Sequence, residues 1–409
     1  MNFHAHPPAQ RRHSLLVPQI FSSIRESVRS GKITPANSPA YRHLLTGAEL
    51  SLTVDPPTVV NKKHMPPSGD KHDYFSLSIY FWPDEKQPDG LPYAPRDGQI
   101  NPETADFDRP GFEAMCAHVD TLSLAFSLSG DERLAAKAAS LLRTWFIDGS
   151  TRMNPHMLFA QHIPGDNVEL PWKDYPARFV PGTDGRPGIF VSFGGVIEDL
   201  YLVPLTDCLR LLRESKHWSE EDHQAMVRWY EGYSEWLLTH QHGLDEAACR
   251  NNHGSWYWAD ILCFLNFTGQ TERARSFAPQ ILRDRYPLQI EPDGSQPEEM
   301  VRAISQSYTA FSLCSFSNIM LSAGQCGFEA WSFQTEDGRS AVKSMDWFLP
   351  YLTGEKVWEW KQIKPFDESS MVGPLAACAH GTGNPKYREA IMRLPGLAPD
   401  DRMRLLYGI

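Results

Sequence analysis

The 409-residue sequence lacks the features that mark several large classes of protein. It contains no apolar run long enough to span a bilayer, so a membrane protein is not expected. It has no cluster of Lys and Arg and a net charge of -11, which argues against nucleic acid as a partner because phosphate binding needs clustered cations. Its 7 cysteines include no Cys-x-x-Cys pair, which argues against a disulfide framework or a zinc knuckle.

A convincing export signal is also lacking. Arg11 and Arg12 precede the apolar residues 15–17, as in a twin-arginine signal, but Pro18 and Arg25 interrupt the apolar core that such a signal needs. With 41% hydrophobic and 22% charged residues, the composition is otherwise that of a globular protein with a sizeable core.

Helical periodicity dominates the chain, and strand signals are scarce. Residues 1–110 are rich in Pro, His and Asp and predict an irregular N-terminal segment, whereas residues 111–409 predict a helical barrel. Amphipathic helices are predicted over residues 112–128, 134–146, 195–212, 220–239, 255–266, 271–282, 297–323, 338–352 and 375–394. Helix pairs without a fixed repeat favour an all-α fold, an (α/α) toroid or barrel of antiparallel helix pairs in one domain, over a solenoid. The long polar insertion 160–193 predicts a lid-like loop.

The sequence Asn251-Asn252-His253-Gly254 is the first candidate for chemistry. Either Asn is a good cap for a helix that begins near Ser255, and either can donate to a substrate carboxylate. The small Gly254 leaves room for a ligand beside His253, whose imidazole suits a base near neutral pH.

A second candidate follows Pro297, which favours a helix start with Glu298 and Glu299 against its positive end. Arg302 and Tyr308 then fall on the same helix, about 120° apart at ~3.6 residues per turn. Because both side chains are long, they can still reach one concave site.

Aromatic residues are dense near the candidate site, and sugar rings stack on such residues. The alternative is an aromatic-rich helical core. His240 and His242 with Asp245 and Glu246 match no zinc motif and are interpreted as surface residues, so neither a metal nor a cofactor is expected.

Several motifs together resemble the alginate lyase superfamily of α/α-toroid polysaccharide lyases, and more closely polysaccharide lyase family 38, whose members act on alginate and glucuronan. The resemblance runs from about residue 73 to 358. It rests on Asp73-Tyr74-Phe75-Ser76-Leu77, Leu91-Pro92-Tyr93 with Arg96-Asp97-Gly98, Thr151-Arg152-Met153-Asn154-Pro155, Asn251-Asn252-His253-Gly254 and residues 289–299.

The resemblance implies roles for particular residues. Arg302 and Asn252, or Asn251, would neutralise the substrate carboxylate; His253 would serve as or support the base, and Tyr308 would act as base, acid or both. The expected substrate-binding residues are Asn251, Tyr74, Trp82, Tyr93, Arg96, Arg152, Asn154, Trp256 and Gln296. Arg250 is a further candidate cation. The expected partner is an acidic polysaccharide, a polyuronate. A periplasmic or secreted location is implied by the resemblance and a cytoplasmic one otherwise, and the oligomeric state is unknown.

The expected reaction is metal-independent β-elimination at a 4-linked uronate of alginate, polymannuronate or β-1,4-glucuronan, which leaves a C4=C5 double bond. In β-D-mannuronate and β-D-glucuronate the C5 hydrogen and the C4 oxygen lie on the same side, so Tyr308 can serve both steps. In α-L-guluronate they lie on opposite sides, which favours His253 as base and Tyr308 as acid. One alternative is a glycoside hydrolase that uses two carboxylates among Asp293, Glu298, Glu299 and Asp260. The other is a sugar-binding protein without activity.

Overall fold

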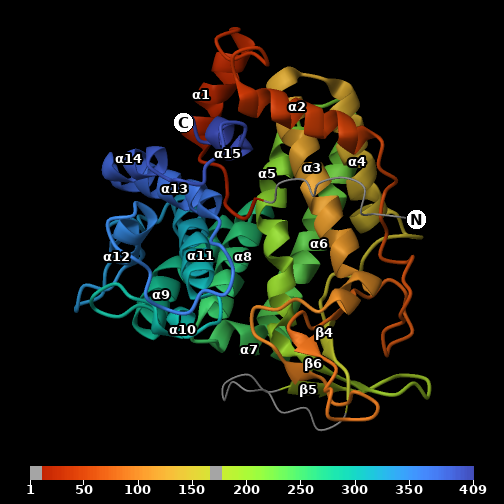
Figure 1. Cartoon of the computed structure of the whole chain (residues 1–409). Helices are drawn as coiled ribbons and strands as arrows, with labels where there is room; N and C mark the ends of the chain where they lie inside the picture. The colour runs from red at the N-terminus through yellow and green to blue at the C-terminus, as the bar shows by residue number, and fades with distance from the viewer. Residues whose placement is uncertain (1–11, 166–176) are drawn as a thin grey trace.

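The computed structural model describes residues 12–165 and 177–409, and most of them are helical (Figure 1). The helices are α1 (Pro18–Arg29), α2 (Pro39–Leu52), α3 (Arg109–Ser129), α4 (Glu132–Leu142), α5 (Leu202–Leu212), α6 (Glu220–Thr239), α7 (Gln241–Ala248), α8 (Asn252–Phe267), α9 (Thr271–Gln289), α10 (Pro297–Met300), α11 (Ser305–Gln325), α12 (Ala341–Leu352), α13 (Val372–Thr382), α14 (Lys386–Met392) and α15 (Arg402–Leu406). Short helical turns are η1 (Pro102–Asp106), η2 (Arg143–Ile147), η3 (Phe193–Tyr201) and η4 (Glu368–Met371).

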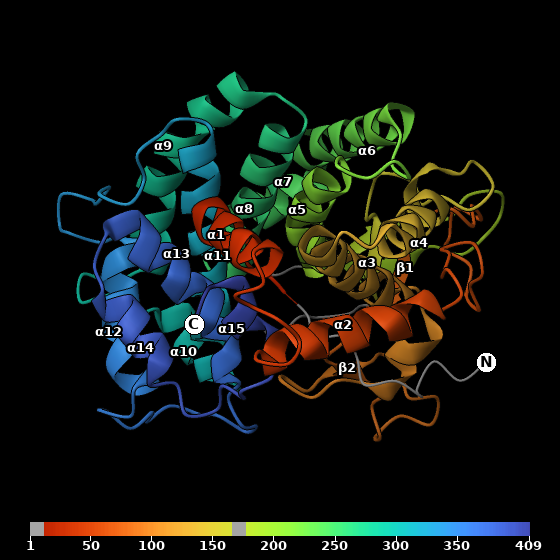
Figure 2. The ribbon, with the colours of Figure 1, turned by 90° about the horizontal axis from the view of Figure 1, so that it is seen from above.

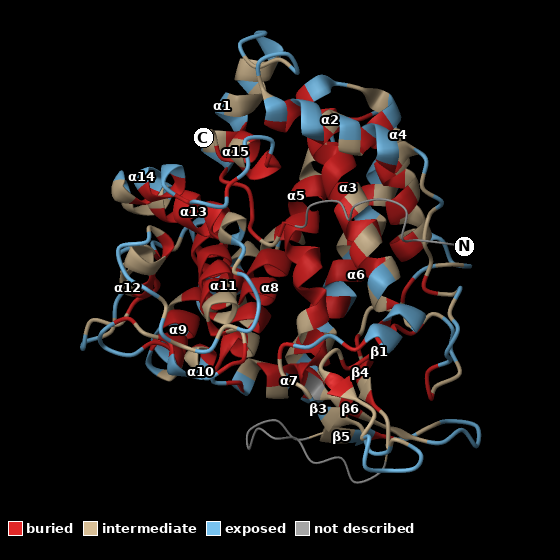
Figure 3. Cartoon of the chain, viewed as in Figure 1, coloured by how far each residue is buried: buried red, intermediate tan, exposed pale blue. Residues whose placement is uncertain are grey.

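The central helices form the core of the protein. Helix α8 packs against α11, α9 and α5, and α5 packs against α3. Seen from above, α3, α4 and α6 lie to the right of α5, α7 and α8, and α12–α14 lie to the left (Figure 2). Helices α5, α8 and α11 are buried over most of their length (Figure 3). All seven cysteines are buried thiols, and no described helix is long and apolar enough to cross a bilayer.

The irregular segment expected over residues 1–110 in fact contains α1 and α2. Both helices begin with proline, Pro18 and Pro39, at the first helical position. Proline is favourable there because its missing N–H would have no partner inside the helix. The proline-rich composition was therefore a helix start signal at these two positions. Helix α2 packs against α3, α4 and α15, as Figure 1 also shows.

The insertion over residues 160–193 contains strands rather than loop alone, so the expectation of a plain loop was wrong there. Strands β4 (Phe159–Ile163), β5 (Ala177–Val180) and β6 (Ile189–Ser192) join β1 (Phe75–Leu77) in a sheet of order β1-β4-β6-β5, in which only the β1–β4 pair is parallel. A second sheet pairs β2 (Phe81–Trp82) with β3 (Ala94–Pro95). Residues 166–176 of the predicted lid lie outside the described residues.

The single helix predicted over residues 297–323 is broken between α10 and α11. At the break, Asp97 Oδ2 accepts a hydrogen bond of 2.8 Å from the backbone N–H of Ala303, which a continuous helix would direct to a carbonyl of the preceding turn. Ile304 also pairs with Gln362 in an isolated β-bridge. Arg302 therefore lies in a turn before α11 rather than on the helix that carries Tyr308.

Candidate active site

A cleft of about 470 Å³ lies between the starts of α8 and α11, the segment around β2, and the segment of β6 and η3. All four predicted catalytic residues line it: Asn252, His253, Arg302 and Tyr308. Asn251, predicted to bind substrate, lines it as well. The volume falls within the usual range for small-molecule and cofactor sites.

Of the residues that the structure describes, Arg302 is one of two arginines that line the cleft, the other being Arg109. The Arg302 guanidinium makes a bidentate ion pair with Asp97, at 2.6 Å for Nη2–Oδ1 and 3.2 Å for Nε–Oδ2. It also stacks on Tyr308, 3.7 Å from the ring centroid, and Nη2 donates to the Tyr308 hydroxyl at 2.8 Å. The break before α11 makes this contact possible, so the 120° separation argued from one helix does not apply.

Tyr308 is half-buried, and its hydroxyl has two polar neighbours. Its hydroxyl accepts from Arg302 and donates to the hydroxyl of Tyr80 at 3.2 Å. Burial raises the pKa of Tyr308 well above its usual value, and the charge of Arg302 offsets this only in part. The phenol is therefore protonated at neutral pH, and Arg302 does not by itself turn it into a phenolate.

The two asparagines have separate roles. Asn251 caps α8, since its side-chain oxygen accepts from the backbone N–H of His253 at 3.2 Å, and the helix consequently begins at Asn252, earlier than predicted. Asn252 is fully buried and is held by Glu299, whose carboxylate accepts from the Asn252 backbone N–H at 2.6 Å and from Nδ2 at 2.7 Å.

Pro297 starts α10 with Glu298 and Glu299 in its first turn, as predicted, and Glu299 is in addition buried. Burial raises the pKa of Glu299 to about 7, while the charge of Arg302 and the two hydrogen bonds from Asn252 act in the opposite direction. Glu299 thus interacts with both groups predicted to meet a substrate carboxylate, with Asn252 through hydrogen bonds and with Arg302 through its charge.

His253 is oriented by a carboxylate that sequence reasoning interpreted as a surface residue. Its Nδ1 lies 2.7 Å from Oε1 of Glu246, which is fully buried on α7. Since a carboxylate only accepts, Nδ1 donates and Nε2 carries the lone pair of the neutral imidazole. This is the arrangement in which a carboxylate fixes the tautomer and orientation of a histidine base. His242, on the same helix, is also buried, so the surface interpretation was wrong for both residues.

Gly254 serves packing rather than ligand approach. A Cβ at this position would lie 2.0 Å from Nη1 of Arg285 and 2.3 Å from the carbonyl oxygen of Cys249. Arg285 is buried and donates to the same Cys249 carbonyl. A small residue is therefore required for the first turn of α8 to pack here, and that turn places His253. The space beside the imidazole comes instead from Gly194, where a Cβ would lie 2.9 Å from Cε1 of His253.

Eight of the nine predicted substrate-binding residues do not line the cleft: Tyr74, Trp82, Tyr93, Arg96, Arg152, Asn154, Trp256 and Gln296. Three of them are buried: Tyr74, Trp256 and Gln296. Tyr74 donates to Glu198 and Gln296 donates to Ser344. Another four, Trp82, Tyr93, Arg96 and Asn154, make separate contacts with acidic residues or with each other. Arg96 lies over the Trp82 ring and pairs with Glu85, Tyr93 donates to Glu103, and Asn154 donates to Asp73. Arg152 and Arg250 are exposed.

Several cleft residues were not predicted, and they come from segments far from the motifs. Tyr80 belongs to the aromatic run before β2, and Gln161 belongs to β4. Arg109, which starts α3, pairs with Glu198 at 3.2 Å and with Glu113 at 2.8 Å. Only the density of aromatic residues near Tyr80 was a signal in the sequence.

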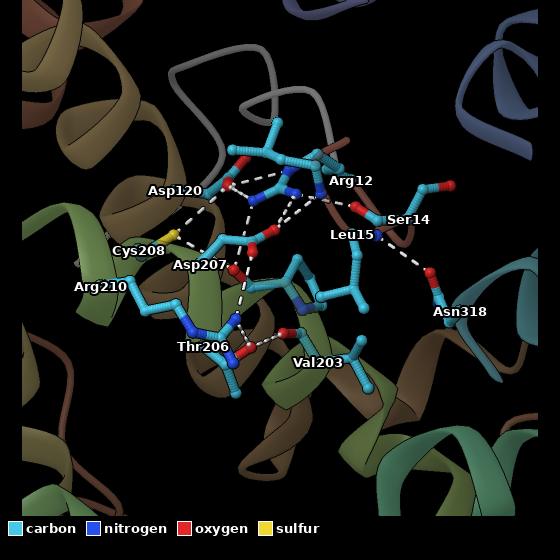
Figure 4. Close-up of polar contacts among 12 residues, drawn as sticks. Arg12, Ser14, Leu15, Asp120, Val203, Thr206, Asp207, Cys208, Arg210 and Asn318 are labelled. Atoms are coloured by element: carbon cyan, nitrogen blue, oxygen red, sulfur yellow. Dashed lines mark hydrogen bonds and ion pairs between the residues drawn. The ribbon is translucent and has the colours of Figure 1, made fainter. Parts of the chain in front are cut away.

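The N-terminal residues beyond Arg11 belong to the core and contribute to the cleft. Arg12 is buried and pairs with Asp120 at 2.8 Å and with Asp207 at 2.7 Å (Figure 4). Asn318 accepts from the backbone N–H of Leu15 and donates to the carbonyl of His13. His13 itself lines the cleft beside Tyr201 and Phe311.

The carboxylates considered for hydrolysis do not face one another across the cleft. Of Asp293, Glu298, Glu299 and Asp260, only Glu298 lines it. Asp260 is fully buried, and burial raises its pKa well above the usual value. Among the residues that the structure describes, no group of three or more His, Cys, Asp or Glu side chains is placed to hold a metal ion.

The chain has relatives among known proteins. The model of the alginate lyase family matches residues 58–358. The chain is similar to the crystal structure of an alginate lyase from Bacteroides ovatus, with 30% identity and a TM-score of 0.85 over 98% of this chain and 99% of that one. It shares its fold with a complex of an alginate lyase A1-III variant with a tetrasaccharide (14% identity, TM-score 0.57, 98% of each chain). It also shares its fold with alginate lyase A1-III from Sphingomonas species A1 (13%, 0.50, 90% and 96%). Curated protein sequences gave no match.

Proposed function

Because this chain belongs to the alginate lyase family, a family of polysaccharide lyases, we propose that it cleaves a 4-linked polyuronate by β-elimination. The substrate is alginate, with its mannuronate and guluronate residues, or β-1,4-glucuronan, and the product carries a C4=C5 double bond. The observation that carries this proposal is the convergence of Asn252, His253, Arg302 and Tyr308 on one cleft.

Arg302 and Asn252 neutralise the carboxylate of the reacting uronate. The proton at C5 becomes acidic only when the neighbouring negative charge is stabilised, since the intermediate resembles an enolate with two charged oxygens. The ion pair with Asp97 holds Arg302 in place. Burial by itself lowers the pKa of Arg302, but the interactions with Tyr308, Asp97 and Glu299 raise it by more, so the guanidinium stays charged. Because Arg302 already supplies a fixed positive charge, the proposed reaction needs no metal ion.

His253 and Tyr308 move the proton. His253, with Glu246 behind it, removes the C5 proton through Nε2, and the protonated Tyr308 donates a proton to the departing C4 oxygen. The raised pKa of Tyr308 favours this division, because a phenol that must first lose its own proton is a poor base at neutral pH. The alternative, in which Tyr308 serves both steps, suits mannuronate and glucuronate. It requires a substrate-bound state in which Tyr308 ionises beside Arg302.

We also propose that the helix pairs form an incomplete or closed α/α toroid and that the chain works as one domain. One cluster of buried side chains, extending in sequence from Leu15 to Tyr407, supports the single domain. The succession of contacts from α3 to α5, from α5 to α8, from α8 to α11 and from α11 to α13 supports the toroid.

The test is the ultraviolet absorbance of the C4=C5 double bond during incubation with polymannuronate, polyguluronate and glucuronan, each with and without a chelator. We expect wild type to produce absorbance on at least one polymer, equally with the chelator. His253→Ala and Tyr308→Phe should reduce the rate by at least about 100-fold, the lower range for removal of a general acid or base. The matched control is Tyr93→Phe, because the Tyr93 hydroxyl also donates a hydrogen bond, in this case to Glu103, but Tyr93 does not line the cleft.

Imidazole in solution provides a second control. If His253 is the base, imidazole restores part of the activity of His253→Ala and leaves Tyr308→Phe unchanged. An active His253→Ala variant would refute the role of His253, and an active Tyr308→Phe variant would refute that of Tyr308. Release of reducing ends by wild type without any absorbance would refute elimination.

A further inference from the structure

A group of partly exposed aromatic rings lies on the connection between α12 and η4. It consists of Trp347 and Tyr351 on α12 with Trp358 and Trp360 on the connection, and we name it the aromatic platform. The centroid of Trp360 lies 4.8 Å from that of Trp358, 5.7 Å from Trp347 and 6.0 Å from Tyr351. A folded core would bury such rings further, so their partial exposure leaves aromatic surface for a ligand.

Hydrogen bonds join the connection to the wall of the cleft. Gln362 donates from Nε2 to Ser307 Oγ at 3.0 Å, and Ser307 lines the cleft. The backbone N–H of Ile363 donates to the carbonyl of Ala303 at 3.0 Å, next to Arg302. The connection that carries Trp358 and Trp360 is therefore fastened to residues 303–307, the segment that follows Arg302 and supplies part of the cleft wall.

The charges beside the platform suit an anionic ligand. Lys356, Lys361 and Lys364 are exposed on this connection. Residues 356–364 carry these three lysines and one acidic residue, Glu359. Asp293 adds a second negative charge near Tyr351, and Glu355 is paired with Arg393 at 3.0 Å. A local excess of positive charge is notable in a protein with a net charge of -11.

We propose that the aromatic platform is a second polyuronate-binding surface, which holds the part of the substrate chain that leaves the cleft past residues 303–307. The apolar face of a sugar ring stacks on an aromatic side chain, and lysines attract the uronate carboxylates. A cleft of about 470 Å³ holds only a short stretch of polymer, so a long chain must continue over its rim. This inference rests on the proposed function, because the occupant is the same polyuronate.

Two of the tryptophans have different parts in the platform. Trp358 donates from Nε1 to Ser305 Oγ at 2.9 Å and packs on the buried Phe348, so it fixes the connection to α11 and α12. Trp360 packs on the rings of Trp347, Tyr351 and Trp358 and is the residue placed to stack on a sugar. Trp360 is consequently the position to change.

The experiment compares long polyuronate with a short uronate oligomer for wild type, Trp360→Ala, Trp360→Phe and Lys361→Ala. Lys32→Ala is the charge control, because Lys32 is exposed near the end of α1. We expect Trp360→Ala to raise KM for the polymer about three- to tenfold, as the loss of one aromatic contact would, with an unchanged kcat. Trp360→Phe should retain most of the affinity, Lys361→Ala should lose affinity mainly at low salt, and all values for the short oligomer should stay at the wild-type level.

Equal losses on polymer and oligomer would overturn the inference, because they would place the effect in the cleft or the fold. No loss on either would overturn it as well. Calorimetric binding of the polymer to His253→Ala, with and without Trp360→Ala, separates this inference from the proposed function. Weaker binding through Trp360→Ala would support the platform even if no double bond were ever formed.

Discussion

Glu299→Gln tests whether the carboxylate behind Asn252 serves catalysis rather than the fold. Both partners of Glu299 are hydrogen-bond donors, the backbone N–H and Nδ2 of Asn252, at 2.6 and 2.7 Å. The substitution keeps the size of the side chain but places an NH2 group opposite one of these donors. The carboxamide of Asn252 then loses a bond or turns over, and in either case it no longer presents the same group to the substrate carboxylate.

The carboxylate of Glu299 affects both kcat and the stability of the fold, and the size of each effect can be worked out separately. Residues that orient a catalytic group through hydrogen bonds typically contribute about 10- to 100-fold to activity, and we expect kcat to fall by this factor. The free energy of unfolding, in contrast, should not fall. An acid whose folded pKa is raised to about 7 lowers stability as pH rises from its ordinary value of 4.5 to 7. Above pH 7 the free energy of unfolding is lower by on the order of 3 kcal/mol because buried Glu299 must ionise. The neutral glutamine of the variant removes this loss, but the altered hydrogen bond to Asn252 cancels part of the gain.

The assay measures kcat and KM by double-bond absorbance from pH 5.5 to 8.5, together with the denaturant midpoint at pH 8. We predict a lower kcat, a smaller change in KM, and a midpoint at pH 8 that is equal to or above that of wild type. Glu299→Asp, one methylene shorter, is the matched control and should lose activity while it retains the pH dependence of stability. A stability loss in Glu299→Gln with activity per folded molecule unchanged would refute the argument and assign Glu299 to the fold.

Three further predictions follow from other contacts. Gly254→Ala should lower stability by roughly 1–3 kcal/mol through overpacking against Arg285, measured by denaturant unfolding; an unchanged midpoint would contradict the packing argument. Arg302→Lys should reduce kcat by at least about 100-fold because one ammonium cannot reproduce the bidentate contact with Asp97 and the stacking on Tyr308; activity within tenfold of wild type would show that charge alone suffices. Burial lowers the pKa of His242 to about 4, so stability should decline as pH falls from 6.5 towards 4, and this decline should be smaller in His242→Gln when midpoints are compared between pH 7 and 4.5.

The sequence predicted elements where local pattern decides the outcome. Helix α6 has the predicted bounds, residues 220–239, because a Ser219 capping box and an amphipathic face specify it locally. Asn251 was weighed as a cap and is one. In contrast, α1 and α2 were missed because their prolines were interpreted as loop signals.

The candidate site was predicted in part for the same reason. Asn252 and His253 are adjacent in sequence, and the family resemblance added Arg302 and Tyr308. The groups that orient them come from other segments: Glu246 from α7, Asp97 from the loop after β3, and Tyr80 from the segment before β2. Such contacts depend on tertiary packing, which spacing along one helix does not encode. The break before α11 is also a tertiary effect, because its cause is the hydrogen bond to Asp97.

The most direct test of elimination is the fate of water during cleavage of a defined polyuronate oligomer. The reaction is run in water enriched in heavy oxygen, and the products are weighed by mass spectrometry. Elimination adds no water, so, apart from oxygen exchange at reducing ends, we predict products whose masses sum to that of the substrate, with an unsaturated residue at the new non-reducing end. Products whose masses sum to that of the substrate plus one heavy water, with saturated non-reducing ends, would show hydrolysis and would contradict the assignment of His253 and Tyr308 to β-elimination.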